Sequence, residues 1–155
     1  MTAIEGLGEF AFRTERLDEM VAFYGDVLGL DRVDDPPFED AAFFRVGDGV
    51  AGHTQVLVLF DRADEDGYTP PAPARTTVDH VAFGVAAEQF DAETERLESL
   101  GYDLTYTYHD WVEWRSAYLD DPDGNSAELV CFDPRDAADE DESPTDHRER
   151  PEAPA

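Results

Sequence analysis

The sequence contains no lysine: its positive charge comes from eleven arginines, which face 38 aspartates and glutamates and leave a formal net charge of −27. A surface of this sign repels phosphate groups, so we expect neither nucleic acid nor an anionic membrane as a partner. An aromatic content of 12% argues against a disordered acidic chain. Dense carboxylates on a folded protein indicate adaptation to high salt, where ions screen their mutual repulsion.

Cysteine and long apolar segments are also scarce. The one cysteine, Cys131, cannot form an internal disulfide, and its apolar neighbours predict a buried, unreactive thiol. No apolar run approaches the roughly 18 residues that a membrane-spanning helix needs. The first residues lack the basic and then apolar pattern of a signal peptide. We therefore expect a cytoplasmic protein with one domain-sized core.

The chain contains an internal repeat. The two copies lie about 70 residues apart, and three pairs of segments align: 9–13 with 80–84, 28–29 with 100–101, and 58–60 with 128–130. A repeat of this length predicts two copies of one supersecondary unit that pack about a pseudo-twofold axis.

The first copy is expected to form a strand, a helix and three strands. Alternation over residues 9–13 predicts the first strand, and apolar residues at helical spacing from Leu17 to Leu28 predict a helix that ends at Gly29. The three strands are expected over residues 31–34, 41–46 and 55–60, with a turn at residues 47–49.

The second copy repeats this order, with a strand over residues 78–85 and a helix from Phe90 to Leu100 that ends at Gly101. Three strands follow over residues 103–108, 115–119 and 127–132, with a turn at residues 120–125. The chain is therefore expected to comprise a first module over residues 1–61, a linker over 62–76, a second module over 77–133 and a disordered acidic tail over 134–155.

Three residues that begin or end a copy carry groups able to bind a metal: Glu9, His80 and Glu128. The fourth equivalent position is Val58, which has no such group. A pseudo-twofold axis can bring Glu9 and His80 opposite each other, and one imidazole with two carboxylates suits Fe(II), Mn(II), Zn(II) or Ni(II). The alternative is that the two glutamates are solvated surface carboxylates and His80 is a core histidine.

Five segments carry a family resemblance: Phe12-Arg13-Thr14, residues 18–24, 27–30, 78–83 and 118–129, the last containing an Asp-Pro-Asp-Gly-Asn hairpin that leads to Glu128. They resemble the vicinal oxygen chelate superfamily, which includes glyoxalase I, bleomycin- and fosfomycin-resistance proteins, methylmalonyl-CoA epimerase and extradiol dioxygenases. The resemblance covers roughly residues 7–133. It implies an α+β fold of two tandem βαβββ modules, whose curved mixed sheets form a metal-containing cup. It places the family's metal ligands at Glu9, Val58, His80 and Glu128.

Val58 bears on which branch of the family the chain resembles. Glyoxalase-like and epimerase-like members place a carboxylate or amide there, whereas valine can neither bind metal nor accept a proton. Extradiol dioxygenases need only three protein ligands, so the chain resembles this branch more closely. Gln55 remains a substitute for the second ligand if the alignment shifts along the strand. Glu9 departs from the histidine that is usual in ring-cleaving members.

Two further residues lie at spacings that resemble ring-cleaving members. Tyr118 and His109 precede Glu128 by ten and nineteen residues, and the resemblance implies that His109 acts as an acid or base and Tyr118 as a hydrogen-bond donor. The alternatives are strand packing for Tyr118 and an ordinary loop histidine for His109. Four aromatic residues are candidates either for a planar-substrate pocket or for the core: Tyr106, Tyr108, Trp111 and Trp114.

The expected function is therefore that of a divalent-metal-dependent enzyme that uses Fe(II) or Mn(II), or else Zn(II) or Ni(II). Its best candidate reaction is extradiol cleavage of a small catechol-like substrate. A glyoxalase I-like isomerase or lyase and a non-catalytic binding protein of the bleomycin-resistance kind are the alternatives. The resemblance also implies a homodimer.

Overall fold

The computed structural model describes residues 3–33 and 38–134. The elements run in the order β1 (Glu9–Thr14), α1 (Leu17–Val21), the π-helix η1 (Ala22–Val27), β2 (Ala41–Val50), β3 (His53–Asp61), the 3-10 helix η2 (Pro73–Arg75), β4 (His80–Gly84), α2 (Ala87–Ser99), β5 (Thr105–His109), β6 (Trp114–Asp120) and β7 (Ser126–Phe132). The expected acidic tail lies outside the described residues from residue 135 onward.

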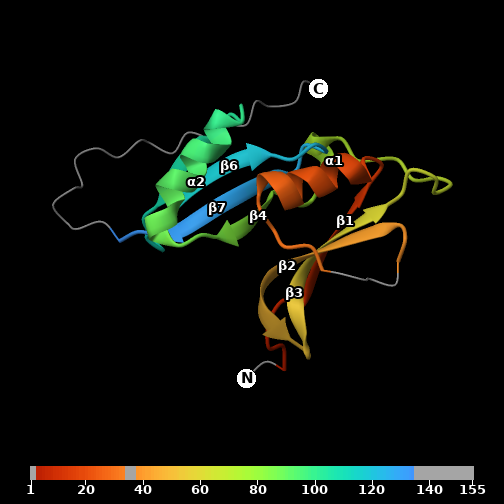
Figure 1. The fold of residues 1–155 in the computed structure, drawn as a ribbon, viewed down its shortest axis with the longest axis horizontal. Helices are drawn as coiled ribbons and strands as arrows, with labels where there is room; N and C mark the ends of the chain where they lie inside the picture. Colours follow the sequence, from red (N-terminus) through yellow and green to blue (C-terminus); the bar gives the residue numbers. More distant parts are fainter. Residues whose placement is uncertain (1–2, 34–37, 135–155) are drawn as a thin grey trace. The chain divides into compact units, whose positions relative to one another are not determined.

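The strands form two sheets, so the α+β fold class is confirmed (Figure 1). One sheet has the order β1-β3-β2 and the other the order β4-β7-β6-β5. The chain divides into two compact units, Met1–Phe83 with Asp120–Ala127, and Gly84–Leu119 with Glu128–Ala155. The turn between β6 and β7 therefore belongs to the first unit.

In the first unit, β1 is parallel to β3, and β2 is antiparallel to β3. Strand alternation directs Phe12 towards the helical side, where its ring stacks on Tyr24 with centroids 6.0 Å apart. The same alternation places Glu9, Ala11 and Arg13 on the opposite face. The core of this unit thus lies on one side of β1, and the charged side chains of Glu9 and Arg13 lie on the other.

The predicted helix over residues 17–28 changes character halfway. The α-helical turn α1 gives way at Ala22 to η1, whose wider turns bring both Phe23 and Tyr24 into the core at 2% and 1% exposure. An α-helix would rotate two consecutive side chains by about 100° relative to each other. The wider turn accommodates two adjacent aromatic rings, which pack edge to face.

The predicted turn at residues 47–49 is wrong, because these residues continue β2. The hairpin instead turns at Ala51 and Gly52, whose φ angles of 53° and 80° match the two-residue turn that joins antiparallel strands. Gly49 serves a different purpose, since a Cβ there would collide with the carbonyl oxygen of His53. The register of β2 also shifts on both sides of Gly47.

The strand expected over residues 31–34 is reduced to a single bridge between Arg32 and Phe44. Two backbone hydrogen bonds flank it, from Val33 to the Phe43 carbonyl and from Arg45 to the Asp31 carbonyl, each 2.8 Å long. Asp34 lies outside the described residues. The segment therefore pairs locally with β2 without forming a full strand.

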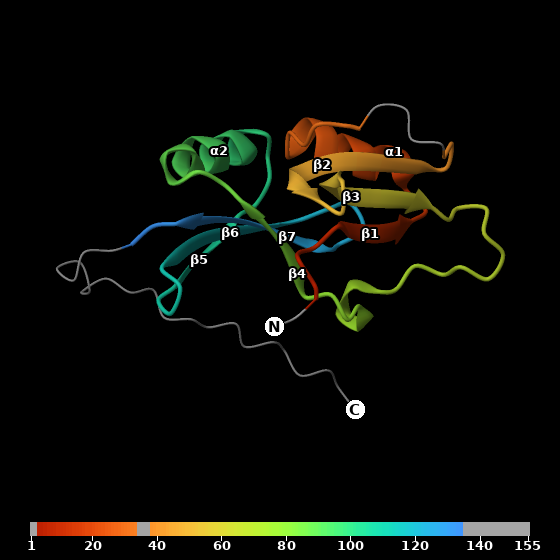
Figure 2. The ribbon, with the colours of Figure 1, turned by 90° about the horizontal axis from the view of Figure 1, so that it is seen from below.

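In the second unit, α2 lies along one face of the sheet (Figure 2). Its buried residues Phe90, Thr94 and Leu97 recur at helical spacing. Arg115 of β6 covers the Phe90 ring with its guanidinium 4.5 Å from the ring centroid. Within the described residues, no helix combines the length and apolar character needed to cross a bilayer.

The turn between β6 and β7 is built around the buried side chain of Asp121. Its Oδ1 accepts the backbone N–H groups of Asp123 and Asn125, and its Oδ2 accepts the Tyr24 hydroxyl, each at 2.9 Å. Burial raises the pKa of Asp121, and hydrogen bonds from Asn125 and Tyr24 oppose this shift. Burial is also the main cause that raises the pKa of Tyr24. This network joins the turn to the core of the first unit.

Candidate active site

Three of the predicted site residues meet in the second unit, on its last three strands. His109 ends β5, Tyr118 lies in β6 and Glu128 lies in β7, and the strand order places β6 between the other two. The Tyr118 hydroxyl oxygen is 2.8 Å from Glu128 Oε1 and 2.9 Å from His109 Nε2. We call these three side chains the hydrogen-bonded triad.

The direction of the triad's hydrogen bonds follows from what each group can donate. A carboxylate only accepts, so the single proton of the Tyr118 hydroxyl is donated to Glu128. The Tyr118 oxygen then accepts the N–H of His109 Nε2. In the neutral imidazole this assigns the proton to Nε2 and leaves Nδ1 as an acceptor.

Burial decreases across the triad from one end to the other. Glu128 is 3% exposed and Tyr118 7%, whereas the His109 side chain is 32% exposed. His109 Nε2 also lies 3.8 Å from Glu128 Oε1, so a protonated imidazole would form an ion pair with this carboxylate. The triad therefore links a solvent-accessible base to a buried carboxylate.

The strength of the Tyr118–Glu128 bond can be compared with a second pair in the same unit. The Tyr106 hydroxyl donates to Glu98 over the same 2.8 Å, but in an exposed setting. We expect a Tyr118→Phe and Glu128→Gln double-mutant cycle to give a coupling of about 1.5 kcal/mol, because low polarity strengthens the buried bond. The Tyr106→Phe and Glu98→Gln cycle should give less than about 0.5 kcal/mol. Urea unfolding of the metal-free variants measures both, and equal couplings would contradict the buried geometry.

In the first unit, Glu9 is exposed at the start of β1, opposite Val56 of β3. Val58 is level with Ala11 and is fully buried. Because side chains alternate along a strand, Val56 and Val58 share the face of Glu9, whereas Gln55 points to the other face. Gln55 there lines a separate, mainly apolar pocket of about 150 Å³. Neither valine offers a ligand on the Glu9 face.

His80 is the first residue of β4, and the carboxylate of Asp79 orients its imidazole ring. Asp79 Oδ2 lies 2.9 Å from His80 Nδ1, and the imidazole is 38% exposed. With Nδ1 as the donor, Nε2 becomes the acceptor nitrogen, an arrangement that is common for metal-binding histidines. Sequence reasoning overlooked Asp79, although an acidic residue directly before a candidate histidine was the available signal.

The proposed metal ligands are divided between the two units: Glu9 and His80 belong to the first and Glu128 to the second. Among residues 3–33 and 38–134, no group of three histidine, cysteine or acidic side chains is placed so that it could hold a metal ion. The metal set therefore stays a prediction.

The other candidate residues mostly have structural contacts. The Tyr108 hydroxyl donates to the Asp133 carbonyl over 2.9 Å, and the Asp133 side chain forms an ion pair in turn with Arg115. Trp111 is 84% exposed in the turn between β5 and β6. Cys131 is buried, as predicted.

The family assignment rests on sequence as well as on fold. The sequence profile of the glyoxalase/bleomycin resistance protein/dioxygenase superfamily matches residues 6–129. The chain therefore belongs to this superfamily, which is the one its motifs resemble.

Individual relatives come from several branches. Glutathione transferase FosA of Serratia marcescens is 30% identical over 126 residues, or 81% of this chain and 80% of the relative. The structure of lactoylglutathione lyase from Agrobacterium tumefaciens is 30% identical with a TM-score of 0.60, covering 84% of this chain and 96% of that one. A mutant of the fosfomycin resistance protein FosX from Listeria monocytogenes, complexed with Mn(II) and dihydroxypropylphosphonic acid, is 23% identical with a TM-score of 0.57, covering 81% and 89%.

Proposed function

We propose that this chain is a divalent-metal-dependent enzyme that acts on a small substrate with vicinal oxygen atoms. Extradiol cleavage of a catechol-like ring is the first candidate reaction. The hydrogen-bonded triad carries the proposal, because it joins an accessible histidine to a buried carboxylate at a predicted ligand position. Its two bonds of 2.8 and 2.9 Å connect the groups that would handle metal and proton.

The donor groups are chemically suited to a divalent ion. An ionised carboxylate as buried as Glu128 is costly to remove from water, and a bound cation would offset this cost. His80 is oriented through Nδ1 by Asp79, so its Nε2 is the nitrogen that would bind metal. With Glu9 as a second carboxylate, Fe(II) or Mn(II) is the first choice and Zn(II) or Ni(II) the alternative. A bound ion would supply Lewis acidity to the vicinal oxygens of a substrate.

His109 is the residue best placed to move a proton. Its Nε2 is engaged by Tyr118, and its Nδ1 is the acceptor that would take a proton from a substrate hydroxyl. The resulting imidazolium would be stabilised by the Glu128 carboxylate 3.8 Å from Nε2. Tyr118 is a positioning residue, since its only proton is donated to Glu128.

We prefer ring cleavage because the residues of β3 beside Glu9 are valines. A glyoxalase-like isomerisation would use a carboxylate or amide there, whereas β3 presents Val56 and Val58 on that face. Neither side chain can bind metal or accept a proton.

A glutathione-dependent isomerisation or addition is the second candidate reaction. It is favoured by the 30% identity to a relative named as a glutathione transferase and to another named as a lactoylglutathione lyase. We also propose that the enzyme is a cytoplasmic homodimer adapted to high salt, as its composition and family resemblance imply.

Metal analysis followed by two activity assays tests this proposal. Protein purified without oxygen in concentrated KCl is expected to contain near-stoichiometric Fe or Mn. The iron-loaded protein is then expected to take up O2 with substituted catechols, and His109→Gln to slow this uptake by about 100-fold or more.

The outcomes separate the candidate reactions. Turnover of a glutathione hemithioacetal without O2 uptake would replace the first reaction by the second. A protein that binds no metal after reloading and turns over neither substrate would be a binding protein, and the proposal would be wrong.

A further inference from the structure

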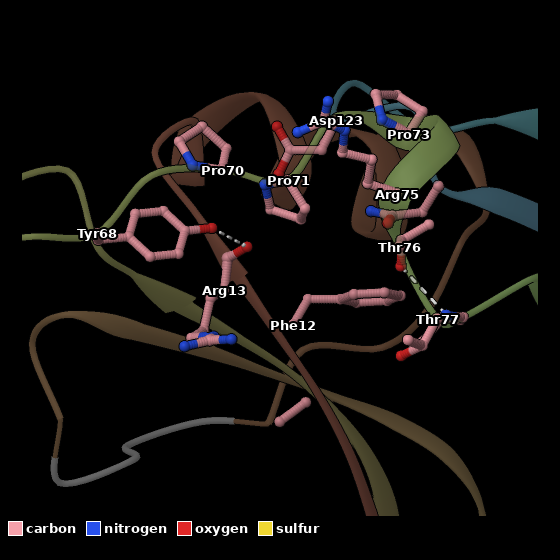
Figure 3. A pocket seen from close by; sticks show the side chains of 13 residues that line it. Phe12, Arg13, Tyr68, Pro70, Pro71, Pro73, Arg75, Thr76, Thr77 and Asp123 are labelled. Atoms are coloured by element: carbon pink, nitrogen blue, oxygen red, sulfur yellow. Dashed lines mark hydrogen bonds between the residues drawn. The ribbon is translucent and has the colours of Figure 1, made fainter. Parts of the chain in front are cut away.

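A pocket of about 340 Å³ in the first unit does not bring reactive groups together (Figure 3). Phe12 and three prolines line much of it, and the Arg13 guanidinium points away from Arg75. None of the residues of the hydrogen-bonded triad lines this pocket. The triad instead lies on a face of the sheet in the second unit, where the packing beneath it determines how its polar groups meet.

The triad lies on the face of this sheet that is opposite to α2. Arg115 of β6 lies over the ring of Phe90 and therefore points towards α2. Because side chains alternate along a strand, Trp114, Ser116 and Tyr118 point to the other face. On that face Ser116 is the residue between Trp114 and Tyr118.

Strand pairing places two small residues between His109 and Tyr118. The register of β5 against β6 gives three pairs on this face: His109 with Trp114, Thr107 with Ser116, and Thr105 with Tyr118. His109 and Tyr118 are thus four residues apart along the strands, or about 13 Å. Since their polar atoms nevertheless lie 2.9 Å apart, both side chains must extend towards each other across the pair of Thr107 and Ser116.

Glu128 reaches the same point from β7. The backbone hydrogen bonds at both ends of the β6–β7 pair fit one antiparallel register, which places Glu128 opposite Tyr118 and Val130 opposite Ser116. Glu128 Oε1 lies 2.8 Å from the Tyr118 hydroxyl oxygen. The junction of the triad therefore lies over the row that contains Thr107, Ser116 and Val130.

Ser116 is fully buried beneath this junction. Its exposed fraction is 0%, whereas Trp114 on the same face is 40% exposed. Within the described residues, the Ser116 Oγ has no hydrogen-bond partner. A buried hydroxyl without a partner is unfavourable, so the hydroxyl itself gives the site no stability. The property of Ser116 that serves the triad is therefore its small size.

We infer that Ser116 is a positioning residue for His109. Its small side chain leaves the space in which the Tyr118 hydroxyl and His109 Nε2 meet, and a larger side chain separates them. The bond to Tyr118 in turn assigns the His109 proton to Nε2 and leaves Nδ1 as the acceptor. The inference rests on the proposed function only for the use of Nδ1 in a reaction.

Long-range proton–nitrogen NMR of the metal-free protein tests this inference, because it distinguishes an imidazole protonated on Nε2 from one protonated on Nδ1. The spectra are recorded at alkaline pH, where imidazoles are neutral, and His109→Gln identifies the signals of His109. We expect protonation on Nε2 alone in the original protein and in Ser116→Ala. Ser116→Val should give a mixture of both tautomers, because the added methyl groups occupy the space of the junction.

Ala117→Val is the matched control. Ala117 follows Ser116 in β6, is equally buried and points to the opposite face. This variant should keep the original tautomer of His109, although it also overpacks the interior. Ser116→Thr adds one methyl group and keeps the hydroxyl, so it is the milder variant if Ser116→Val does not fold, and it should also give a mixture.

Four results would each overturn the inference: both tautomers in the original protein, a mixture in Ser116→Ala, Nε2 protonation alone in Ser116→Val and Ser116→Thr, or an equal mixture in Ala117→Val. In the iron-loaded protein, Ser116→Val should slow O2 uptake about tenfold or more, whereas Ser116→Ala should keep the original rate. If the original protein takes up no O2, the proposed ring cleavage is wrong, but the tautomers of the metal-free variants still decide the role of Ser116.

Discussion

Replacing Glu128 with glutamine is expected to weaken divalent-metal binding by more than about 100-fold while leaving the fold as stable or more stable. Loss of a partner that only orients a ligand already costs about 10- to 100-fold in affinity, and removal of the ligand itself should cost more. Stability should move the other way, because Glu128 is 3% exposed and a neutral amide is easier to bury than a carboxylate. Competition with a chelating dye measures the first quantity, and thermal unfolding of the metal-free protein measures the second.

Two comparison variants make the Glu128 experiment specific. Glu98→Gln alters a glutamate that accepts a tyrosine hydroxyl over the same 2.8 Å, but at an exposed site, and it should change neither quantity. His80→Ala should weaken metal binding at least as strongly as Glu128→Gln, although the two residues are far apart in the sequence. Unchanged metal content in either variant would remove that residue from the ligand set.

Replacing Asp121 with alanine is expected to destabilise the protein by about 3 kcal/mol, the largest stability effect we predict. The substitution leaves the buried Tyr24 hydroxyl and the backbone N–H groups of Asp123 and Asn125 without their acceptor. Asp123→Ala is the control from the same turn and should remain within about 0.5 kcal/mol. Tyr24→Phe removes one of the hydrogen bonds and should cost about 1 kcal/mol. Urea unfolding gives all three values, and equal losses for Asp121 and Asp123 would contradict the network.

The raised pKa of Asp121 also sets the sign of its pH dependence. The folded state retains the proton to a higher pH than the unfolded chain does. Stability from this group therefore falls as pH rises from its ordinary pKa through the raised one. Asp121→Asn should remove this contribution, so the difference in stability between the variant and the original protein should vary across that window.

The sequence predicted the order of the elements well, because β1 and β4 alternate, most other strands are apolar runs between turn residues, and both helices carry an apolar face. The prediction failed at residues whose conformation differs from the one that is usual for their residue type. Gly47 and Gly49 suggested a turn, but they belong to an irregular part of β2, where Gly49 is needed because the backbone of His53 passes too close for a side chain. Ala51 adopts a φ angle of 53° that its residue type would not predict.

For the site, the sequence identified candidate residues but could not predict the contacts between them. The spacings of His109, Tyr118 and Glu128 suggested that these residues belong together, and strand pairing brings their polar atoms within hydrogen-bonding distance. Spacing could not show that Tyr118 donates to Glu128, because that depends on which acceptor lies closest in space. The contact between Asp79 and His80 was overlooked because adjacent side chains on a regular strand point to opposite faces.

The position of the turn between β6 and β7 determines whether the protein can be expressed as two separate fragments. The sequence repeat suggests a cut in the segment before β4, yet residues 120–127 belong to the compact unit that contains β1 to β3. A fragment that stops at this cut would expose the Tyr24 hydroxyl, whose acceptor Asp121 would be on the missing piece. The halves should therefore be recovered by co-expression and reassociation, rather than as two separately folded proteins. The two copies of the sequence repeat therefore do not coincide with the two compact units.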